Sequence, residues 1–249
     1  RTAFEASEVA RIHAVCDIDA ERLPEAQEKL GAAEAYTDYA EMLARSFPDQ
    51  GRHRLVVDAG NGSMGIVAPP ILRRLGHEVV PLYCEPDGTF PHRDPNPAVP
   101  SHLLALRKEV RRHEAELGIA YDGDGDRVVF VDETGAVLPA DRALVLLIRH
   151  VLAEQPGAAV VYDLKSSSVV PEAVLAAGGR PIMERSGYGF IKRRLIEEGA
   201  ALGGEVSGHY FFGALGGDDA LYATLLMLRV LDRLEAPLSM AMATVPSYP

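Results

Sequence analysis

Residues 55–63 read LVVDAGNGS, and residues 160–168 read VVYDLKSSS. Each is a short valine-rich run that ends at an aspartate and continues into a polar or glycine-rich turn. Such a run is typical of a buried β-strand whose carboxyl end meets a turn. In both places a helical pattern follows and ends at glycine, at Gly76 and at Gly178-Gly179.

The correspondence between these two parts of the chain extends further. A second strand is expected after each helix, at residues 77–82 and 180–183. Later in each part a Leu-Gly pair leads into another strand, and a helix that starts at aspartate closes the part, at Asp141 and at Asp218-Asp219. We expect these aspartates to cap their helices. Six matches in the same order indicate an internal duplication.

Strands that alternate with helices predict an α/β fold. We predict two tandem, duplicated α/β domains with mixed sheets covered by helices, at residues 51–153 and 154–243. A partial Rossmann-like βαβ fragment at residues 1–50 would precede them, and a linker at residues 244–249 would follow. In such sheets, ligands bind beyond the carboxyl ends of the strands.

The composition is that of a globular protein, with 47% hydrophobic residues, 24% charged residues and a formal net charge of −11. A chain this acidic is not expected to bind nucleic acid through a broad basic face. No apolar run approaches the roughly 18 residues of a membrane span, so we expect no membrane partner. Cys16 and Cys84 lie far apart and outside any Cys-x-x-Cys pattern, which argues against a zinc site and favours the reducing cytoplasm.

Residues 122–127 read DGDGDR and place aspartates at alternate positions, Asp122, Asp124 and Asp126. The glycines between them allow a tight turn, so the carboxylates should converge. Converging carboxylates repel one another unless a cation neutralises them. Hard oxygen ligands select Mg²⁺, Mn²⁺ or Ca²⁺ over zinc, and a short loop leaves coordination positions open for water or a substrate phosphate, as Mg²⁺ prefers.

Two alternatives apply to this acidic loop. In an EF-hand calcium loop that starts at Asp122, Glu133 would be the twelfth residue. Arg127 stands at the sixth position, however, where that loop requires glycine, and residues 128–131 predict a strand. The other alternative is a solvated acidic turn without metal, which the threefold repeat followed by arginine disfavours.

From about Leu55 onward the chain resembles the bacterial phosphomannomutase/phosphoglucomutase group of the α-D-phosphohexomutase superfamily. The resemblance rests on the order and spacing of four segments, at residues 57–62, 87–97, 122–127 and 204–209. It implies the two middle domains of a four-domain enzyme. Such an enzyme is an isomerase that moves phosphate between the two ends of a hexose by means of Mg²⁺ and a phosphoserine.

The resemblance also implies roles for single residues. These are the metal ligands Asp122, Asp124 and Asp126, the catalytic residues Arg127, Lys165 and Tyr188, and the substrate-binding residues Glu205, Ser207 and His209. Arg127 would lie beside the phosphate, and Lys165 would face the reacting groups. Glu205 and Ser207 would form hydrogen bonds with sugar hydroxyls, with His209 beside them. The implied partners are hexose phosphate and hexose 1,6-bisphosphate.

The sequence departs from that family at three points. Nothing resembles the Thr-Ala-Ser-His-Asn-Pro type segment that carries the phosphoserine in the first domain, and the phosphate-binding loop of the fourth domain is absent. Tyr188 stands where close relatives often carry a histidine, and a hydroxyl with a pKa near 10 is a poorer proton shuttle at neutral pH. We therefore expect a chain truncated at both ends that binds metal without turning over sugar phosphates.

Residues 1–47 resemble part of the nucleotide-binding domain of the Gfo/Idh/MocA oxidoreductases, through VCDID at residues 15–19 and YTDY at residues 36–39. Asp17 stands where a Rossmann fold meets the ribose. The Gly-x-Gly-x-x-Gly turn that would cradle a pyrophosphate is missing. An NAD-dependent oxidoreductase fragment and a non-catalytic metal or sugar-phosphate binding module are therefore the alternatives to a phosphohexomutase core.

Overall fold

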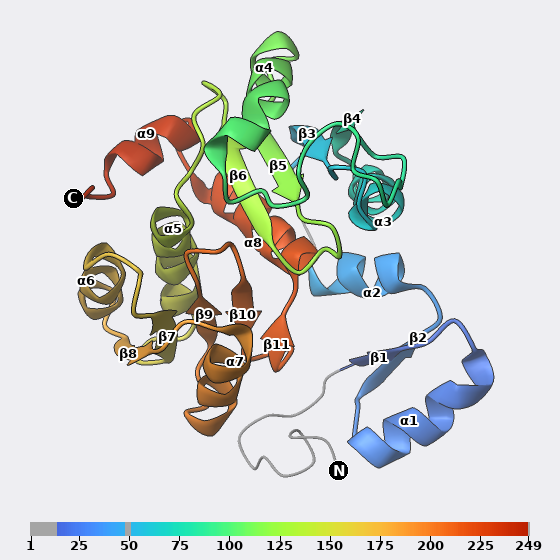
Figure 1. Ribbon diagram of the computed structural model, residues 1–249. Coiled ribbons are helices and arrows are strands. Elements are labelled where there is room, and N and C mark those ends of the chain that lie inside the picture. The colour runs from blue at the N-terminus through green and yellow to red at the C-terminus, as the bar shows by residue number, and fades with distance from the viewer. Residues whose placement is uncertain (1–13, 48–50, 249) are drawn as a thin grey trace.

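The computed structural model describes residues 14–47 and 51–248, and its first part is a small parallel βαβ unit (Figure 1). Its elements are β1 (Ala14–Cys16), the 3-10 turn η2 (Ala20–Arg22), α1 (Leu23–Leu30), β2 (Glu34–Tyr36) and α2 (Tyr39–Ser46). This confirms the predicted βαβ fragment. Residues 1–13 and 48–50 of the predicted fragment lie outside the described residues.

Local sequence signals set the ends of these helices. The Asp19 carboxylate accepts a hydrogen bond from the Glu21 amide (3.0 Å), and Asp38 accepts one from the Glu41 amide (3.0 Å). Gly31 ends α1 with a φ of 65°, a left-handed conformation that glycine adopts without strain.

The first repeat (residues 54–154) contains a four-stranded sheet with helices around it. Its elements are β3 (Arg54–Asp58), α3 (Met64–Arg74), β4 (Glu78–Leu82), η3 (Pro100–Leu103), α4 (Leu104–Arg112), β5 (Leu117–Tyr121), β6 (Val128–Asp132) and α5 (Ala140–Glu154). The strand order is β4-β3-β5-β6, in which β6 alone runs antiparallel to its neighbour. Every residue of β5 and β6 is buried, because α4 covers one face and the shared core covers the other.

The second repeat (residues 159–233) is built in the same way. Its elements are β7 (Ala159–Asp163), α6 (Val169–Ala176), β8 (Arg180–Glu184), α7 (Tyr188–Glu197), β9 (Leu202–Gly204), β10 (Tyr210–Phe212), β11 (Gly217–Asp218) and α8 (Ala220–Arg233). The strand order is β8-β7-β9-β10-β11, with β10 antiparallel to both of its neighbours. A short helix, α9 (Leu238–Ala243), follows.

The two sheets confirm the predicted duplication and the mixed α/β fold. In each repeat the first strand lies between the second and the third, and the fourth strand returns antiparallel to the third. The glycines that were expected to end the first helices, Gly76 and Gly178, have φ values of 100° and 76°. The loop between the third and fourth strands therefore occupies the same place in both repeats.

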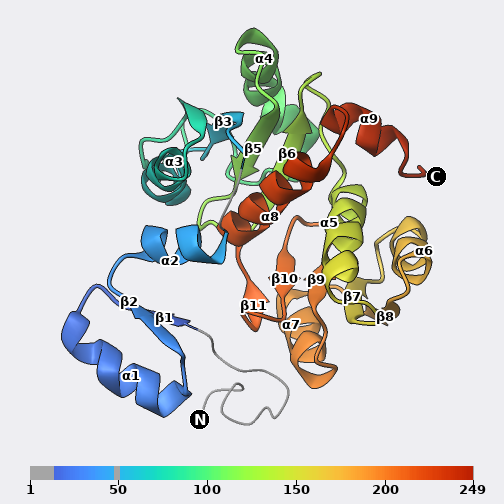
Figure 2. The same ribbon diagram turned by 180° about the vertical axis from the view of Figure 1, so that it is seen from behind.

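The closing helix of each repeat packs on the other repeat (Figure 2). Helix α8 lies against the first sheet, where the buried hydroxyls of Tyr121 and Thr224 are 2.7 Å apart. Helix α5 lies against the second sheet, where the Leu144 side chain fills the space beside Gly204. The repeats thus share one hydrophobic core. No helix in the described part of the chain is long and apolar enough to cross a membrane.

Of the two predicted aspartate caps, one is confirmed and one is wrong. Asp219 caps α8, because its carboxylate accepts a hydrogen bond from the Tyr222 amide (2.8 Å). Asp141 is not a cap, since α5 begins at Ala140 after Pro139 and has no side-chain cap. The Asp141 carboxylate instead accepts a hydrogen bond from the Ser167 amide (3.2 Å) of the second repeat.

Candidate active site

The acidic loop (residues 122–127) joins β5 to β6 and is organised around its first aspartate. Asp122 is buried, and its Oδ1 accepts hydrogen bonds from the amides of Gly125 (2.9 Å) and Arg127 (3.2 Å). Gly125 has a φ of 86°, and a Cβ there would come within 2.5 Å of the Met64 side chain. Glycine is therefore required at this turn for both conformation and space.

The three aspartates of the loop converge, as their spacing predicted. Asp122, Asp124 and Asp126 each offer a carboxylate oxygen within 4.8 Å of the others. Arg127 Nε lies 2.8 Å from Asp122 Oδ2 and 3.7 Å from Asp126 Oδ1, so one guanidinium faces two of the three carboxylates. Asp126 Oδ1 is buried and has no hydrogen-bond partner. The residues therefore fit a hard divalent cation such as Mg²⁺, which takes carboxylate oxygens and keeps open positions.

A buried ion pair holds the chain directly before the acidic loop. Arg93 Nε lies 3.0 Å from both carboxylate oxygens of Asp58, and both side chains are almost fully buried. Arg93 Nη2 also donates to the carbonyl of Tyr121 (2.7 Å), the residue directly before Asp122. Gly60 leaves room for the guanidinium, because a Cβ there would come within 2.5 Å of Arg93 Cζ. This support was not predicted, although the sequence shows Asp58 at the end of a buried strand.

The Glu205 loop (residues 205–209) joins β9 to β10 and carries the predicted sugar-binding residues. The Glu205 carboxylate is buried and accepts a hydrogen bond from the Gly187 amide (2.5 Å). Ser207 Oγ lies 2.8 Å from His209 Nδ1, and Glu205 Oε2 lies 3.2 Å from the same nitrogen. Burial opposes ionisation of Glu205, but the hydrogen bonds from His209 and Gly187 outweigh burial and lower the pKa of this carboxyl.

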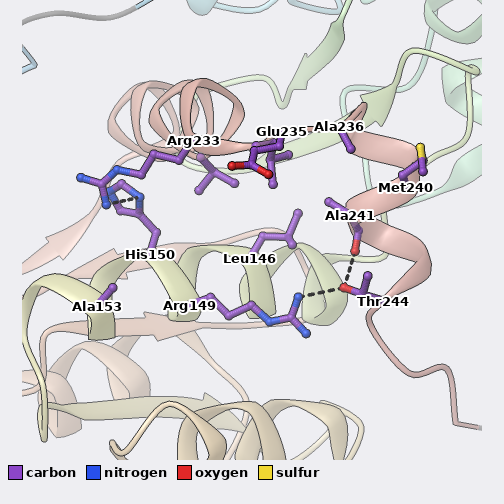
Figure 3. Close-up of a pocket in the computed structure, with 12 residues that line it drawn as sticks. Leu146, Arg149, His150, Ala153, Arg233, Glu235, Ala236, Met240, Ala241 and Thr244 are labelled. Carbon is purple, nitrogen blue, oxygen red and sulfur yellow. Dashed lines mark hydrogen bonds between the residues drawn. The ribbon is translucent and has the colours of Figure 1, made fainter.

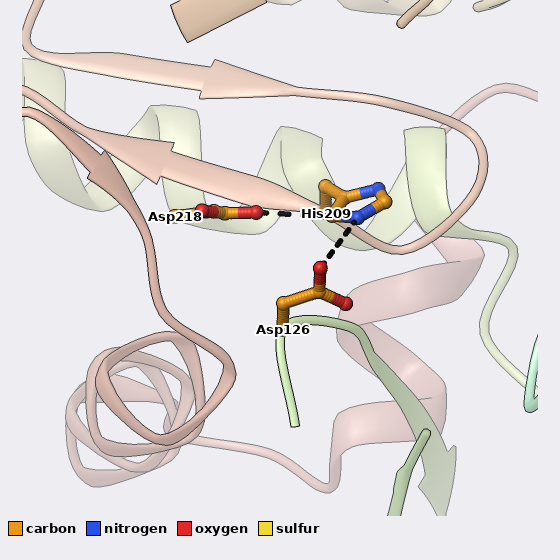
Figure 4. A group of neighbouring side chains, drawn as sticks. All are labelled: Asp126, His209 and Asp218. Atoms are coloured by element: carbon orange, nitrogen blue, oxygen red, sulfur yellow. Dashed lines mark ion pairs between the residues drawn. The ribbon is translucent and has the colours of Figure 1, made fainter. Parts of the chain in front are cut away.

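The acidic loop and the Glu205 loop touch each other. Arg127 and His209 form an antiparallel bridge, and the Val128 amide donates to the carbonyl of Gly208 (3.0 Å). The contact continues in the side chains, where His209 Nε2 lies 3.3 Å from Asp126 Oδ2 (Figure 4). Burial acts to lower the pKa of His209, but its hydrogen bond with Glu205 and the charge of Asp126 outweigh burial and raise it.

Asp218, at the end of β11, joins this group and was not predicted. Its side chain is 7% exposed, and its Oδ2 lies 3.9 Å from His209 Nε2. Burial raises the pKa of Asp218 to about 6, against the opposing effect of His209. The sequence pattern assigned Asp218 only to a helix start, so its approach to His209 had no sequence signal.

Three further predicted site residues, Tyr188, Lys165 and Asp17, each lie in a different part of the fold. Tyr188 begins α7, its ring centroid lies 6.3 Å from that of His209, and its hydroxyl accepts a hydrogen bond from Lys192 Nζ (2.9 Å). Lys165 is exposed in the turn after β7 and has no hydrogen bond or ion pair with any described residue. Asp17, the predicted ribose contact, instead pairs with Arg22 (2.9 Å).

A groove with a volume of about 480 Å³ lies elsewhere on the molecule, between α5, α8 and α9 (Figure 3). Leu146 and Met240 are among its apolar lining residues, and Arg149 and Glu235 are among its charged ones. None of the residues predicted to bind metal or sugar lines it. The candidate active site is therefore the contact between the two loops.

Comparisons with known proteins agree with this geometry. Residues 34–135 match the family model for phosphoglucomutase/phosphomannomutase alpha/beta/alpha domain II, and residues 139–248 match the model for domain III. A phosphomannomutase/phosphoglucomutase of Pseudomonas aeruginosa is 42% identical over 182 residues, which is 72% of this chain and 39% of that protein. A phosphoglucomutase of Neisseria meningitidis is 40% identical over 186 residues, 74% of this chain and 40% of that protein.

Solved structures show the same relationship. A phosphoglucomutase/phosphomannomutase family protein of Burkholderia thailandensis superposes with a TM-score of 0.80 at 37% identity, over 88% of this chain and 49% of that one. An N-acetylphosphoglucosamine mutase of Aspergillus fumigatus, solved with GlcNAc-6P and magnesium, shares the fold with a TM-score of 0.64 at 17% identity, over 85% of this chain and 50% of that one.

The fold and the two loops define an α/β protein of the phosphohexomutase type. The chain belongs to the phosphoglucomutase/phosphomannomutase family, and it contains domains II and III. It spans about two fifths of the length of the curated relatives described above. The match to domain II begins at residue 34 and so includes α2, whose Phe47 end packs on Tyr222 with ring centroids 4.9 Å apart.

Proposed function

We propose that this chain is the metal- and sugar-binding core of a phosphohexomutase that interconverts the 1-phosphates and 6-phosphates of glucose or mannose. The distance of 3.3 Å between Asp126 Oδ2 and His209 Nε2 is the observation that supports this most directly. Because the acidic loop and the Glu205 loop meet there, a phosphate held beside the acidic loop would lie next to the groups that face a sugar. Phosphoryl transfer depends mainly on such positioning and on neutralising charge.

In this proposal Asp122, Asp124 and Asp126 hold Mg²⁺, which when bound would neutralise charge on the phosphoryl group. Arg127 is oriented by its ion pair with Asp122 (2.8 Å) and would contribute a second positive charge. Lys165 is exposed, and its ammonium would reach the substrate when the sugar phosphate binds. Tyr188, whose ring centroid lies 6.3 Å from that of His209, would donate a hydrogen bond at the site.

Glu205 and Ser207 would recognise the sugar. An ionised carboxylate accepts hydrogen bonds from sugar hydroxyls, and the lowered pKa of Glu205 keeps it ionised. Ser207 Oγ, 2.8 Å from His209 Nδ1, offers a hydroxyl beside it. The N-acetylphosphoglucosamine mutase of Aspergillus fumigatus was solved with GlcNAc-6P and magnesium. We propose that this chain binds the same class of ligand, a hexose phosphate together with Mg²⁺.

Calorimetric titration with glucose 1,6-bisphosphate in the presence of Mg²⁺ tests the sugar-binding role. Glu205→Gln should weaken binding about 10- to 150-fold, because a hydrogen bond to a charged group contributes roughly 1.5–3 kcal/mol. Glu28→Gln, an exposed position on α1, makes the same change of charge and should leave binding unaltered. Equal affinity of the Glu205 variant and the unmodified chain would refute the proposed sugar contact.

We also propose that the chain by itself does not catalyse the reaction, because no segment of it resembles the phosphoserine segment of the family. The assay is conversion of glucose 1-phosphate with added glucose 1,6-bisphosphate, and turnover well above background would contradict the proposed inactivity.

The predicted cytoplasmic location belongs to the same proposal and is supported by two free cysteines.

A further inference from the structure

Three side chains from distant parts of the chain meet beside the acidic loop. Asp126 comes from that loop, His209 from the Glu205 loop and Asp218 from β11 (Figure 4). His209 Nε2 lies 3.3 Å from Asp126 Oδ2 and 3.9 Å from Asp218 Oδ2. One ligand atom of each residue lies within 4.8 Å of the other two. The group includes a ring nitrogen, which sets it apart from the all-oxygen trio of the acidic loop.

The other ring nitrogen of His209 is already engaged. Nδ1 lies 3.2 Å from Glu205 Oε2 and 2.8 Å from Ser207 Oγ. When Nδ1 keeps a proton for the carboxylate of Glu205, the Nε2 of a neutral His209 is free to bind a metal on the side of Asp126 and Asp218. This is the arrangement that histidine ligands of metals usually show, with the second ring nitrogen bonded to a carboxylate.

The carboxylate of Asp218 is buried and forms one long ion pair, with His209 Nε2 (3.9 Å). Its side chain is only 7% exposed, and its Oδ2 is buried without a hydrogen-bond partner. In the described part of the chain, no lysine or arginine lies within ion-pair distance of Asp218. The nearby Lys192 donates to the hydroxyl of Tyr188 (2.9 Å) instead. A buried carboxylate is normally hydrogen-bonded, paired or bound to a metal, and this oxygen, which has no hydrogen bond, is therefore a candidate metal ligand.

We propose that Asp126, His209 and Asp218 form a second cation site, distinct from the acidic trio, that binds Zn²⁺ or a similar transition metal. One imidazole nitrogen with two carboxylate oxygens suits zinc, whereas Mg²⁺ prefers oxygen alone. Bonds of about 2.0–2.1 Å in a tetrahedron place ligand atoms about 3.3 Å apart, close to the distances found here. Such an ion would connect the acidic loop of the first repeat to β11 of the second.

The site shares Asp126 with the acidic trio, but the remaining ligands differ. Asp122 and Asp124 belong only to the trio, while His209 and Asp218 belong only to the second group. Substitutions at Asp124 and at Asp218 therefore separate the two sites. The proposal rests on the ligand geometry and is independent of mutase activity.

Isothermal titration with ZnCl₂ in a large excess of Mg²⁺ tests this site, because the excess competes with Zn²⁺ for the oxygen ligands of Asp122 and Asp124, which Mg²⁺ prefers. One Zn²⁺ per chain should bind, and Asp218→Asn and His209→Gln should each weaken binding at least about tenfold. Asp124→Asn should bind Zn²⁺ as the unmodified chain does, and so should His113→Gln, a control on the partly exposed histidine after α4. Unchanged Zn²⁺ affinity in both Asp218→Asn and His209→Gln overturns the proposal, as does a loss confined to Asp124→Asn.

A second measurement uses the unmodified chain, in case the variants fold poorly. X-ray absorption of the chain loaded with one equivalent of Zn²⁺ should show scattering from a single imidazole together with oxygen ligands. A zinc environment of oxygen alone, or no zinc retained after dialysis against Mg²⁺, would overturn the proposal.

Discussion

The hydroxyls of Tyr121 and Thr224 lie 2.7 Å apart in the shared core, and together they tie the strand before the acidic loop to helix α8 of the other repeat. Thr224 Oγ1 also donates to the carbonyl of Ala220 (2.9 Å). Its proton is therefore engaged within the helix, and Tyr121 is the donor between the repeats. Removing the Thr224 hydroxyl therefore leaves the Tyr121 hydroxyl without an acceptor, whereas removing the Tyr121 hydroxyl leaves Thr224 bonded to Ala220.

Thr224→Val should destabilise the chain more than Tyr121→Phe. The valine variant leaves a fully buried tyrosine hydroxyl without an acceptor, at a cost of about 1–3 kcal/mol. The phenylalanine variant leaves Thr224 bonded to Ala220 and should cost about 1 kcal/mol. The double variant should recover part of the loss from Thr224→Val. Urea unfolding of the three variants measures this, and the reverse order of the single variants would contradict the assigned donor.

Arg93→Met should impair both the stability of the fold and metal binding. The substitution leaves Asp58 as an unpaired buried charge, which typically costs 3–5 kcal/mol. It also removes the donor to the Tyr121 carbonyl directly before the acidic loop. Combining it with Asp58→Asn should restore much of the stability without restoring the support of the loop. The measurements are the urea midpoint and the Mg²⁺ affinity. An Mg²⁺ affinity unchanged in a folded Arg93→Met/Asp58→Asn variant would show that Arg93 does not position the loop.

The sequence predicted the strands and the convergence of the aspartates because these depend on local signals. The apolar runs at β3 and β7 end at Asp58 and Asp163 as expected, and Gly125 makes the turn that brings the carboxylates of the acidic loop together. The roles assigned to those aspartates remain predictions.

The sequence did not predict features that depend on how the repeats pack. Because α5 and α8 exchange positions, Asp141 contacts Ser167 of the second repeat instead of capping its own helix. Asp218 reaches His209 because β11 extends the second sheet, and Arg93 reaches Asp58 across a long loop. No periodicity of the sequence encodes such contacts, since they join segments far apart in the chain.

Mg²⁺ should raise the melting temperature of the chain, and Asp124→Asn should abolish this effect. Asp124 is exposed, so its substitution should leave the unliganded fold unchanged. Binding at 100 times the dissociation constant stabilises the folded state by about 2.7 kcal/mol. Thermal unfolding with and without Mg²⁺ measures the shift. Glu28→Gln serves as the control for lost surface charge and should keep the full Mg²⁺ effect. An equal Mg²⁺ effect in the unmodified chain and in Asp124→Asn would exclude this residue as a ligand.

Acid should destabilise the chain through His77, which is buried beside His53 with ring centroids 5.8 Å apart. Burial, followed by the charge of His53, lowers the pKa of His77 to about 4, whereas the unfolded value is about 6.5. Between these values the unfolded chain binds a proton that the folded chain does not, so stability falls as pH falls from about 6.5 to about 4. The loss from this residue should be no more than about 3 kcal/mol.

His77→Gln keeps an acceptor for the His53 amide, which lies 3.3 Å from His77 Nδ1, and removes the titrating group. Urea unfolding at several pH values should therefore give a smaller decrease in stability for His77→Gln than for the unmodified chain. Some decrease should remain, because burial also lowers the pKa of His150. His113→Gln, at a partly exposed histidine, should retain the decrease of the unmodified chain. If His77→Gln follows that same curve, His77 is not a source of the acid sensitivity.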